Sequence, residues 1–218
     1  MTKRILRLGA ILIGLSALAQ SATPTSAASL YLAWRGPDAD DGIYAMRTTN
    51  VEQSGRGGSW CQPPGKGTAT GVSLTNFRDK VYMAWRGVND DDNICWSRLN
   101  STDVCGGWEP QHRLSDRGTA GAPAIIAFND IILMVWRGVR DDRAMYWSLF
   151  DGTNWTPQQA IPGIGTDADQ SYVPRPGLAV FNGLVLHGLA RNSRRRQHLL
   201  DDVRRQAVEQ RARAAPLD

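Results

Sequence analysis

A segment of about 50 residues recurs three times along the chain, and this repeat restricts the possible folds. Trp34, Trp85 and Trp136 are spaced 51 residues apart. Each begins a Trp-Arg-Gly sequence and is followed six residues later by an Asp, then by a short run of apolar and aromatic residues. Repeats of this length are typical of arrays in which each copy is one supersecondary unit.

The third copy shows the expected local structure most clearly. Asn129 and Asp130 separate two apolar runs, 124–128 and 131–136, which we expect to form a hairpin. A third strand is expected at 144–150 and, after the turn DGTN, a fourth at 155–161. These runs are rich in β-branched and aromatic residues, as strands are.

Four short strands that repeat at about 50 residues predict an all-β fold, namely a β-propeller of four-stranded blades. The competing architecture, a β-solenoid, usually has much shorter repeats. We assign 29–187 to an incomplete propeller of about three blades and the start of a fourth. The first blade begins with its second strand, so closing a ring would need a strand resembling GLAVFNG from its far end. The segment GLAVFNG at 177–183 instead opens the fourth blade.

Residues 1–28 have the pattern of a secretory signal. Lys3, Arg4 and Arg7 precede the apolar stretch 8–19, and small residues surround Ala27. An uncleaved membrane anchor is the alternative, but the apolar stretch is shorter than the roughly 20 residues that a spanning helix needs. We therefore predict a cleaved signal helix and a secreted protein that does not associate with membranes.

The repeat stops at Gly188, where an arginine-rich segment begins. Leu189 stands where the fourth copy should carry its Trp. If the reading frame slips by one base near His187, suitable synonymous codons turn 187–210 into TAWRGTADDASIYWTTFDGKRWSS, which matches the third copy in spacing. We expect 188–218 to be a non-native, out-of-frame basic tail. A basic amphipathic helix or a disordered segment is the alternative.

The positive charge of the chain belongs to this tail. The formal net charge is +4, and residues 188–218 alone carry a surplus of four positive charges. The part between signal and tail is slightly acidic. We therefore expect no nucleic-acid partner.

Cys61, Cys95 and Cys105 are the three cysteines. An exported chain can oxidise one pair. A Cys95–Cys105 bond would staple one hairpin, and a Cys61–Cys105 bond would join neighbouring copies. We favour the first pairing, and one thiol remains in either case.

The repeated Trp-Arg-Gly…Asp set is the main candidate for a binding site. Arginine offers a planar fork of donors, aspartate accepts from hydroxyls, and an aromatic ring packs on the apolar face of a sugar. One set in each blade would give weak, multivalent binding. The candidate ligand-binding residues are Trp34, Arg35, Asp40, Trp85, Arg86, Asp91, Trp96, Trp136, Arg137, Asp142 and Trp147. In the alternative, purely structural role, the Arg and Asp of each set pair across the hairpin and the Trp packs between blades.

Metal binding and catalysis have weaker signals. The clusters DADD and NDDD offer oxygens to calcium, but the twelfth position counted from Asp38 is Thr49 rather than the Glu of an EF-hand, so we expect solvated turns. Glutamate is scarce, the prominent Asp residues are repeated rather than unique, and no Ser-His-Asp or metal-ligand spacing is present. We predict no metal, no cofactor and no catalytic residue.

The third copy, FNDIILMVWRGVRDDRAMYWSLFDGTNWTPQQAIPGIGT, resembles the repeats of secreted bacterial β-propellers of the sialidase-like and fucose-lectin-like superfamilies. The resemblance covers about 30–187. SLFDGTNW at 148–155 is similar to the Asp-box turn of sialidases, although Asp151 and Gly152 are adjacent where that motif spaces them. The resemblance implies a propeller fold and sugar binding, but the sialidase arginine triad and Tyr-Glu pair have no counterparts here.

The expected function is therefore that of a secreted, lectin-like carbohydrate-binding module with glycans as partners. The alternative is the remnant of a sialidase-like glycoside hydrolase whose catalytic blades are missing. A protein-binding scaffold is a third reading.

Overall fold

The computed structural model describes residues 29–49, 60–165, 176–181 and 184–187, together with Arg205 and Glu209. The segments predicted as signal (1–28) and tail (188–218) lie outside these residues, apart from Arg205 and Glu209. The described part is built from antiparallel sheets, which confirms the all-β prediction. No helix in this part is long and apolar enough to cross a membrane.

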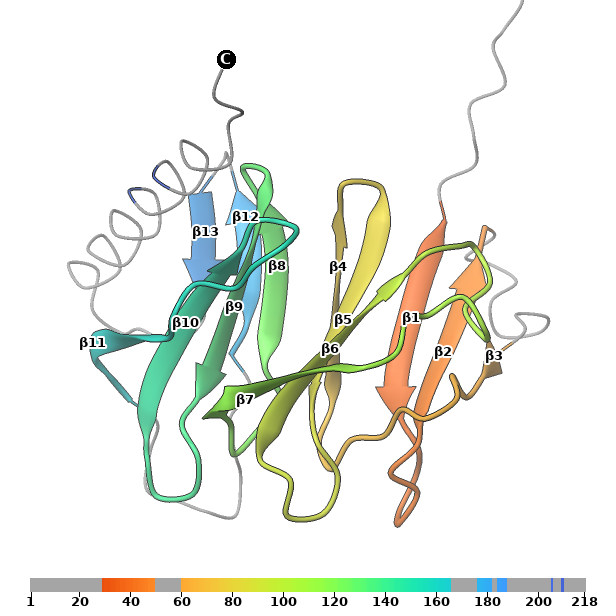
Figure 1. Cartoon of the computed structure of the whole chain (residues 1–218), viewed down its shortest axis with the longest axis horizontal. Helices are drawn as coiled ribbons and strands as arrows, with labels where there is room; N and C mark the ends of the chain where they lie inside the picture. Colours follow the sequence, from red (N-terminus) through yellow and green to blue (C-terminus); the bar gives the residue numbers. More distant parts are fainter. Residues whose placement is uncertain are drawn as a thin grey trace, which may run out of the picture.

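Three sheets follow one another in chain order, one for each copy of the repeat, and a two-stranded sheet follows them (Figure 1). Unit 1 contains β1 (Leu30–Arg35), β2 (Ile43–Thr48) and β3 (Trp60–Cys61). Unit 2 contains β4 (Val72–Phe77), β5 (Lys80–Arg86), β6 (Asn93–Leu99) and β7 (His112–Gly118). Unit 3 contains β8 (Ala124–Phe128), β9 (Ile131–Arg137), β10 (Ala144–Phe150) and β11 (Gln159–Gly165), and a hairpin of β12 (Leu178–Phe181) and β13 (Leu184–His187) follows. Within each sheet, sequential strands are neighbours.

The predicted strands of unit 3 agree with β8, β9 and β10, but the prediction for the last strand was wrong. That strand runs over Gln159–Gly165 rather than 155–161. Trp155 forms only an isolated bridge to Phe150, which closes the DGTN turn. Pro157 follows and has no N–H to donate to a ladder, so regular pairing starts after it.

The predicted hairpin turn at Asn129 and Asp130 is confirmed. Both residues have positive φ, 46° and 62°, as do Arg78 and Asp79 at the equivalent turn of unit 2, 48° and 57°. Two consecutive left-handed residues match the right-handed twist of a two-residue hairpin. Asn and Asp adopt this conformation more readily than most residues.

The core lies between the units, where one sheet packs against the next. Ile43 of unit 1 clusters with Met83 and Trp85 of unit 2. In the same way, Tyr82 of unit 2 clusters with Trp136 of unit 3. The first strands of units 2 and 3, β4 and β8, contact each other, and β8 contacts β12 (Figure 1). Each sheet is therefore stabilised mainly by its neighbours.

Unit 1 differs from the others because β1 is the edge of its sheet. Its residues align with those of β5, the second strand of unit 2. Leu30, Leu32 and Trp34 lie on one face of β1 and are 38–39% exposed. The equivalent residues of β5 are buried against unit 1. The apolar face of β1 is thus covered by no described sheet.

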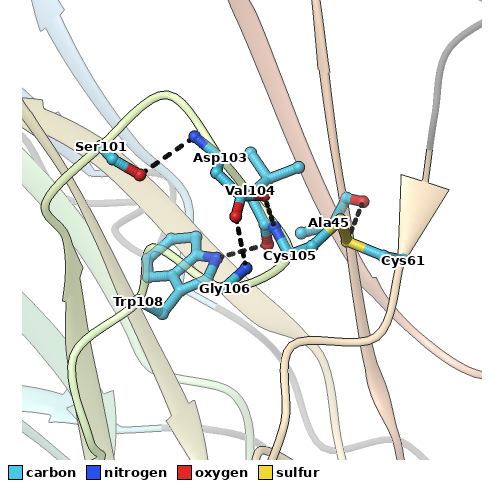
Figure 2. The surroundings of a disulfide bond; sticks show 8 residues. All are labelled: Ala45, Cys61, Ser101, Asp103, Val104, Cys105, Gly106 and Trp108. Carbon is cyan, nitrogen blue, oxygen red and sulfur yellow. Dashed lines mark hydrogen bonds between the residues drawn. A yellow bond between two sulfur atoms is a disulfide. The ribbon is translucent and has the colours of Figure 1, made fainter.

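A disulfide joins Cys61 to Cys105, so the favoured Cys95–Cys105 pairing was wrong (Figure 2). Cys61 is in β3 of unit 1, and Cys105 lies in the loop after β6 of unit 2, with 5.6 Å between the two Cα atoms. Cys95 lies within β6, opposite Trp85, and is buried in the interface with unit 1 as a free thiol. The bond therefore links two units rather than stapling one hairpin.

Candidate binding site

The arginine of each Trp-Arg-Gly sequence reaches back over its own loop. Arg35 donates from Nε and Nη2 to Asp41 Oδ1, at 3.0 and 2.6 Å. Arg86 donates in the same way to Asp92 Oδ1, at 3.1 and 2.5 Å. The expected pairing with Asp40 and Asp91 was therefore wrong by one residue, because the partner is the next aspartate along the chain.

The aspartate six residues after the Trp organises the loop instead. Asp40 Oδ1 accepts from the Gly42 N–H at 2.8 Å, and its Oδ2 accepts from the Tyr44 hydroxyl at 2.6 Å. Asp142 makes the equivalent bonds to the Ala144 N–H and the Tyr146 hydroxyl, both at 2.9 Å. The hydrogen bond from Tyr44 lowers the pKa of Asp40 and raises the pKa of the tyrosine. Both oxygens of this aspartate are thus used within units 1 and 3.

Unit 2 departs from this pattern because Cys95 occupies the position of the tyrosine. Asp91 Oδ1 accepts from the Asn93 N–H and side-chain amide, at 3.0 and 2.6 Å, and lies 2.5 Å from Arg113 Nη2. Its Oδ2 makes no hydrogen bond with the described residues. Asp91 therefore retains an acceptor oxygen that its counterparts commit to tyrosine.

Unit 3 departs from the pattern at its arginine. Position 143, seven residues after Trp136, is Arg where units 1 and 2 have Asp41 and Asp92. Arg137 donates from Nη2 to the Arg140 carbonyl at 2.9 Å, and its buried Nε has no hydrogen-bond partner in the described part of the chain. Arg137 and Asp142 are therefore not brought together as a pair.

The tryptophans proposed to face a ligand lie mainly in the core. Trp85, Trp136 and Trp147 are buried, the first two completely. Trp96 is half-buried and stacks on His112, with 4.3 Å between ring centroids. Trp34 is exposed and stacks on Tyr44 on the uncovered face of unit 1. The three buried tryptophans serve packing between or within units and offer no surface to a ligand.

A cavity of about 450 Å³ lies where the loops of units 1 and 2 meet. Its lining combines carboxylates, side-chain amides, an ammonium group, a thiol and several glycines, in contrast to the apolar core between the same sheets. The lining residues are Asp41, Gly42, Gln62, Gly65, Lys66, Gly67, Gly87, Val88, Asp91, Cys95 and Gln111. Of the sequence candidates, only Asp91 contributes to this cavity.

The cavity exists next to Cys95, the residue that breaks the repeat. Tyr44 and Tyr146 extend from the equivalent position to the carboxylates of Asp40 and Asp142. A cysteine is too short to do so, and space remains beside Asp91. Burial raises the pKa of the Cys95 thiol to about 11, so the group is neutral near pH 7. The thiol thus acts as a small wall residue.

Lys66 crosses from unit 1 to unit 2 along this cavity. Its Nζ donates to the Glu109 carbonyl at 2.8 Å, and the side chain is buried. Burial lowers the pKa of its ammonium. The Glu109 side chain points elsewhere, since its Oε1 accepts from Arg98 at 2.5 Å and from Asn100 at 2.9 Å.

Sequence reasoning missed Gln62, Lys66 and Gln111 because it searched for what the repeat preserves. The cavity is instead lined by residues at positions where the copies of the repeat differ. Aligning the copies would have shown Gly-Lys at 65–66 against Asp-Arg at 116–117, and Cys95 against tyrosine. A departure from an internal repeat at a loop end is therefore the signal that could have located the site.

Within the described ranges, no three His, Cys, Asp or Glu side chains are grouped to hold a metal ion. The Glu109 carboxylate is held by Arg98 and Asn100 on the unit 2 sheet. The arrangement offers hydrogen-bond donors and acceptors around a cavity, which suits binding of a polar molecule.

No protein-family model matches the chain, and a comparison with curated proteins found no match either.

Proposed function

We propose that the protein is a secreted, carbohydrate-binding β-propeller whose sugar site is the cavity between units 1 and 2. The observation that carries the proposal is Asp91, whose Oδ2 lacks the tyrosine hydroxyl that satisfies its counterparts. A sugar hydroxyl in the cavity would supply that missing donor. Hydrogen bonds to an ionised carboxylate are stronger than those between neutral groups.

Several features support a propeller. Units 2 and 3 are sequential four-stranded antiparallel meanders at a 51-residue spacing, and unit 1 has three strands among the described residues. Their faces pack on one another, and their first strands meet along one side. This arrangement is what successive blades around an axis require.

The disulfide supports export. Cys61 and Cys105 join separate units in a chain that has only three cysteines. Structural disulfides persist in oxidising compartments and are rare in the cytosol. A bond of this kind agrees with the signal-like pattern of residues 1–28.

The lining of the cavity supports a hydroxyl-rich ligand. Gln62 and Gln111 each bring a donor and an acceptor, Lys66 brings a donor, and Asp91 an acceptor. The volume lies in the range usual for small-molecule sites. Recognition here would depend on hydrogen bonds, since the lining contains no aromatic side chain. The site belongs to one interface, because Tyr146 fills the Cys95 position at the next.

The test is titration calorimetry of the full chain with glucose, galactose, mannose and fucose, repeated on Cys95→Tyr. The introduced tyrosine would bond Asp91, as Tyr44 and Tyr146 bond Asp40 and Asp142, and its ring would occupy the cavity beside Asp91. We expect binding of at least one sugar by the native chain and at least a tenfold loss in this variant.

Cys95→Ser is the matched control, because it changes the thiol without filling the cavity. It should bind like the native chain. Undiminished binding by Cys95→Tyr, or no binding of any sugar by the native chain, would overturn the proposal.

A further inference from the structure

We infer that the cavity selects a saccharide that carries a carboxylate, with Gly65 and Lys66 as the point that receives it. A uronic acid is the simplest ligand of this class. The inference rests on the proposed function and narrows the substrate class of the same site.

The repeat supplies an internal reference for Lys66. Arg117 lies 51 residues later and, like Lys66, crosses to the following unit. Lys66 Nζ donates to the Glu109 carbonyl at 2.8 Å, and Arg117 Nη1 donates to the Thr156 carbonyl at 3.0 Å. These two carbonyls are equivalent, since each also accepts from a serine hydroxyl of the neighbouring strand, Ser97 or Ser148. Lys66 and Arg117 are therefore the same inter-unit contact in two copies.

The two cations differ in their counter-charge. Asp116 accepts from Arg117 through both oxygens, at 2.9 and 2.7 Å. Gly65 replaces this aspartate beside Lys66. Lys66 forms no ion pair with any described residue, although the residue is as buried as Arg117, with 7% of each residue exposed. A buried cation without an anion is costly, so the position favours an anion from outside.

Space is available where the missing carboxylate would lie. Gly65 and Lys66 both line the cavity, and a Cβ added to Gly65 would meet no atom within 4 Å. The other charges of the lining are compensated, since Asp41 pairs with Arg35 and Asp91 with Arg113. Lys66 is thus the uncompensated charge of the cavity, and burial holds its pKa below the ordinary lysine value in the absence of an anion.

A uronic acid offers a partner to each of two groups, the Lys66 ammonium and Asp91 Oδ2. Its carboxylate would pair with Lys66, as Asp116 pairs with Arg117. One of its hydroxyls would donate to Asp91 Oδ2, as Tyr44 donates to Asp40. Both contacts reproduce bonds that other copies of the repeat make internally.

The experiment compares sugars that differ in one group, galacturonate with galactose and glucuronate with glucose, by titration calorimetry on the full, disulfide-bonded chain. We expect at least one uronate to bind about tenfold more tightly than its neutral partner, as a charge-assisted hydrogen bond would give. The preference should weaken as salt is raised and should disappear in Lys66→Gln.

Gly65→Asp and Gly65→Asn form a matched pair that does not depend on removing the buried lysine. Gly65 has φ +68°, a conformation that Asp and Asn both tolerate better than most residues. Aspartate would supply the internal carboxylate that Arg117 has, so Gly65→Asp should lose the uronate preference. Gly65→Asn fills the same space without a charge and should also weaken uronate binding, while only Gly65→Asp should raise the stability of the chain to urea by giving Lys66 a counter-charge.

The outcomes separate the two claims. If neutral hexoses bind and uronates bind no better, the acidic-ligand inference fails while the proposed sugar site stands. If uronate preference persists in Gly65→Asp and in Lys66→Gln, the assignment to these residues is wrong. If neither hexose nor uronate binds, the proposed function itself fails.

Discussion

Asp92 Oδ1 receives both Nε and Nη2 of Arg86, at 3.1 and 2.5 Å, and so holds the arginine against its own loop. Arg35 and Asp41 repeat the arrangement in unit 1. Unit 3 has the arginine, Arg137, without the aspartate. The repeat therefore allows a comparison between arginines whose Nε has a carboxylate partner and one whose Nε has none among the described residues.

We predict that Arg143→Asp stabilises the protein by restoring this pair. Arg137 Nε is buried without a hydrogen-bond partner among the described residues, and an aspartate at 143 would accept from it. The expected gain in the free energy of unfolding is about 1–2 kcal/mol, measured by urea denaturation. Arg143→Asn, which offers a neutral acceptor, should gain less. A loss of stability in Arg143→Asp would contradict the assignment of position 143 to the aspartate role.

Removing the disulfide should destabilise the protein substantially. The bond closes a loop between residues that are 44 apart in sequence. The chain-entropy model gives about 4 kcal/mol for a loop of this size. Urea denaturation of a Cys61→Ser, Cys105→Ser double variant should show this loss. Reductant should lower the stability of the native chain and leave that of the double variant unchanged.

Cys95 should resist alkylation in the folded protein. Its thiol is buried, and burial raises its pKa to about 11, so little thiolate exists at pH 8. We expect iodoacetamide to label the chain at pH 8 only after unfolding in urea, as measured by mass spectrometry. Rapid labelling of Cys95 under native conditions would show that the thiol is reached from the cavity or that the interface between units 1 and 2 opens readily.

Tyr44→Phe should change how Asp40 titrates. The hydrogen bond from the Tyr44 hydroxyl is the main cause of the lowered pKa of Asp40. Without it, the pKa should rise toward the ordinary value of 3.8, as followed by carboxyl carbon shifts in NMR. Because the folded-state pKa is depressed, this contribution to stability is present above the unfolded-state pKa and is lost as pH falls through the folded-state value. Tyr146→Phe should leave Asp40 unchanged, since Tyr146 serves Asp142.

Local features of the sequence predicted the strands of unit 3 because short β-branched runs bounded by Asn129 and Asp130 carry their own turn geometry. The last strand was misplaced because Trp155 looked like a strand residue, whereas Pro157 delays pairing until Gln159. The disulfide was missed because it depends on how unit 1 packs on unit 2. Spacing along the chain does not contain that information.

The candidate site was predicted only in part, for a related reason. The repeat pointed to Trp85 and Trp136 as ligand-binding residues. Both residues instead pack one unit on the next. Asp41 and Asp92 were overlooked because a run of adjacent aspartates does not reveal which one faces the arginine. The cavity residues Lys66 and Cys95 mark places where the repeat is broken.

The exposed apolar face of β1 makes unit 1 different from units 2 and 3. Units 2 and 3 each have a preceding sheet that shields their second strand, while no described sheet covers Leu30, Leu32 and Trp34 of unit 1. A unit that packs on a described neighbour through one face opens more easily than one that packs through both. The Cys61–Cys105 bond ties unit 1 to unit 2. It therefore limits local opening of the interface that contains the cavity.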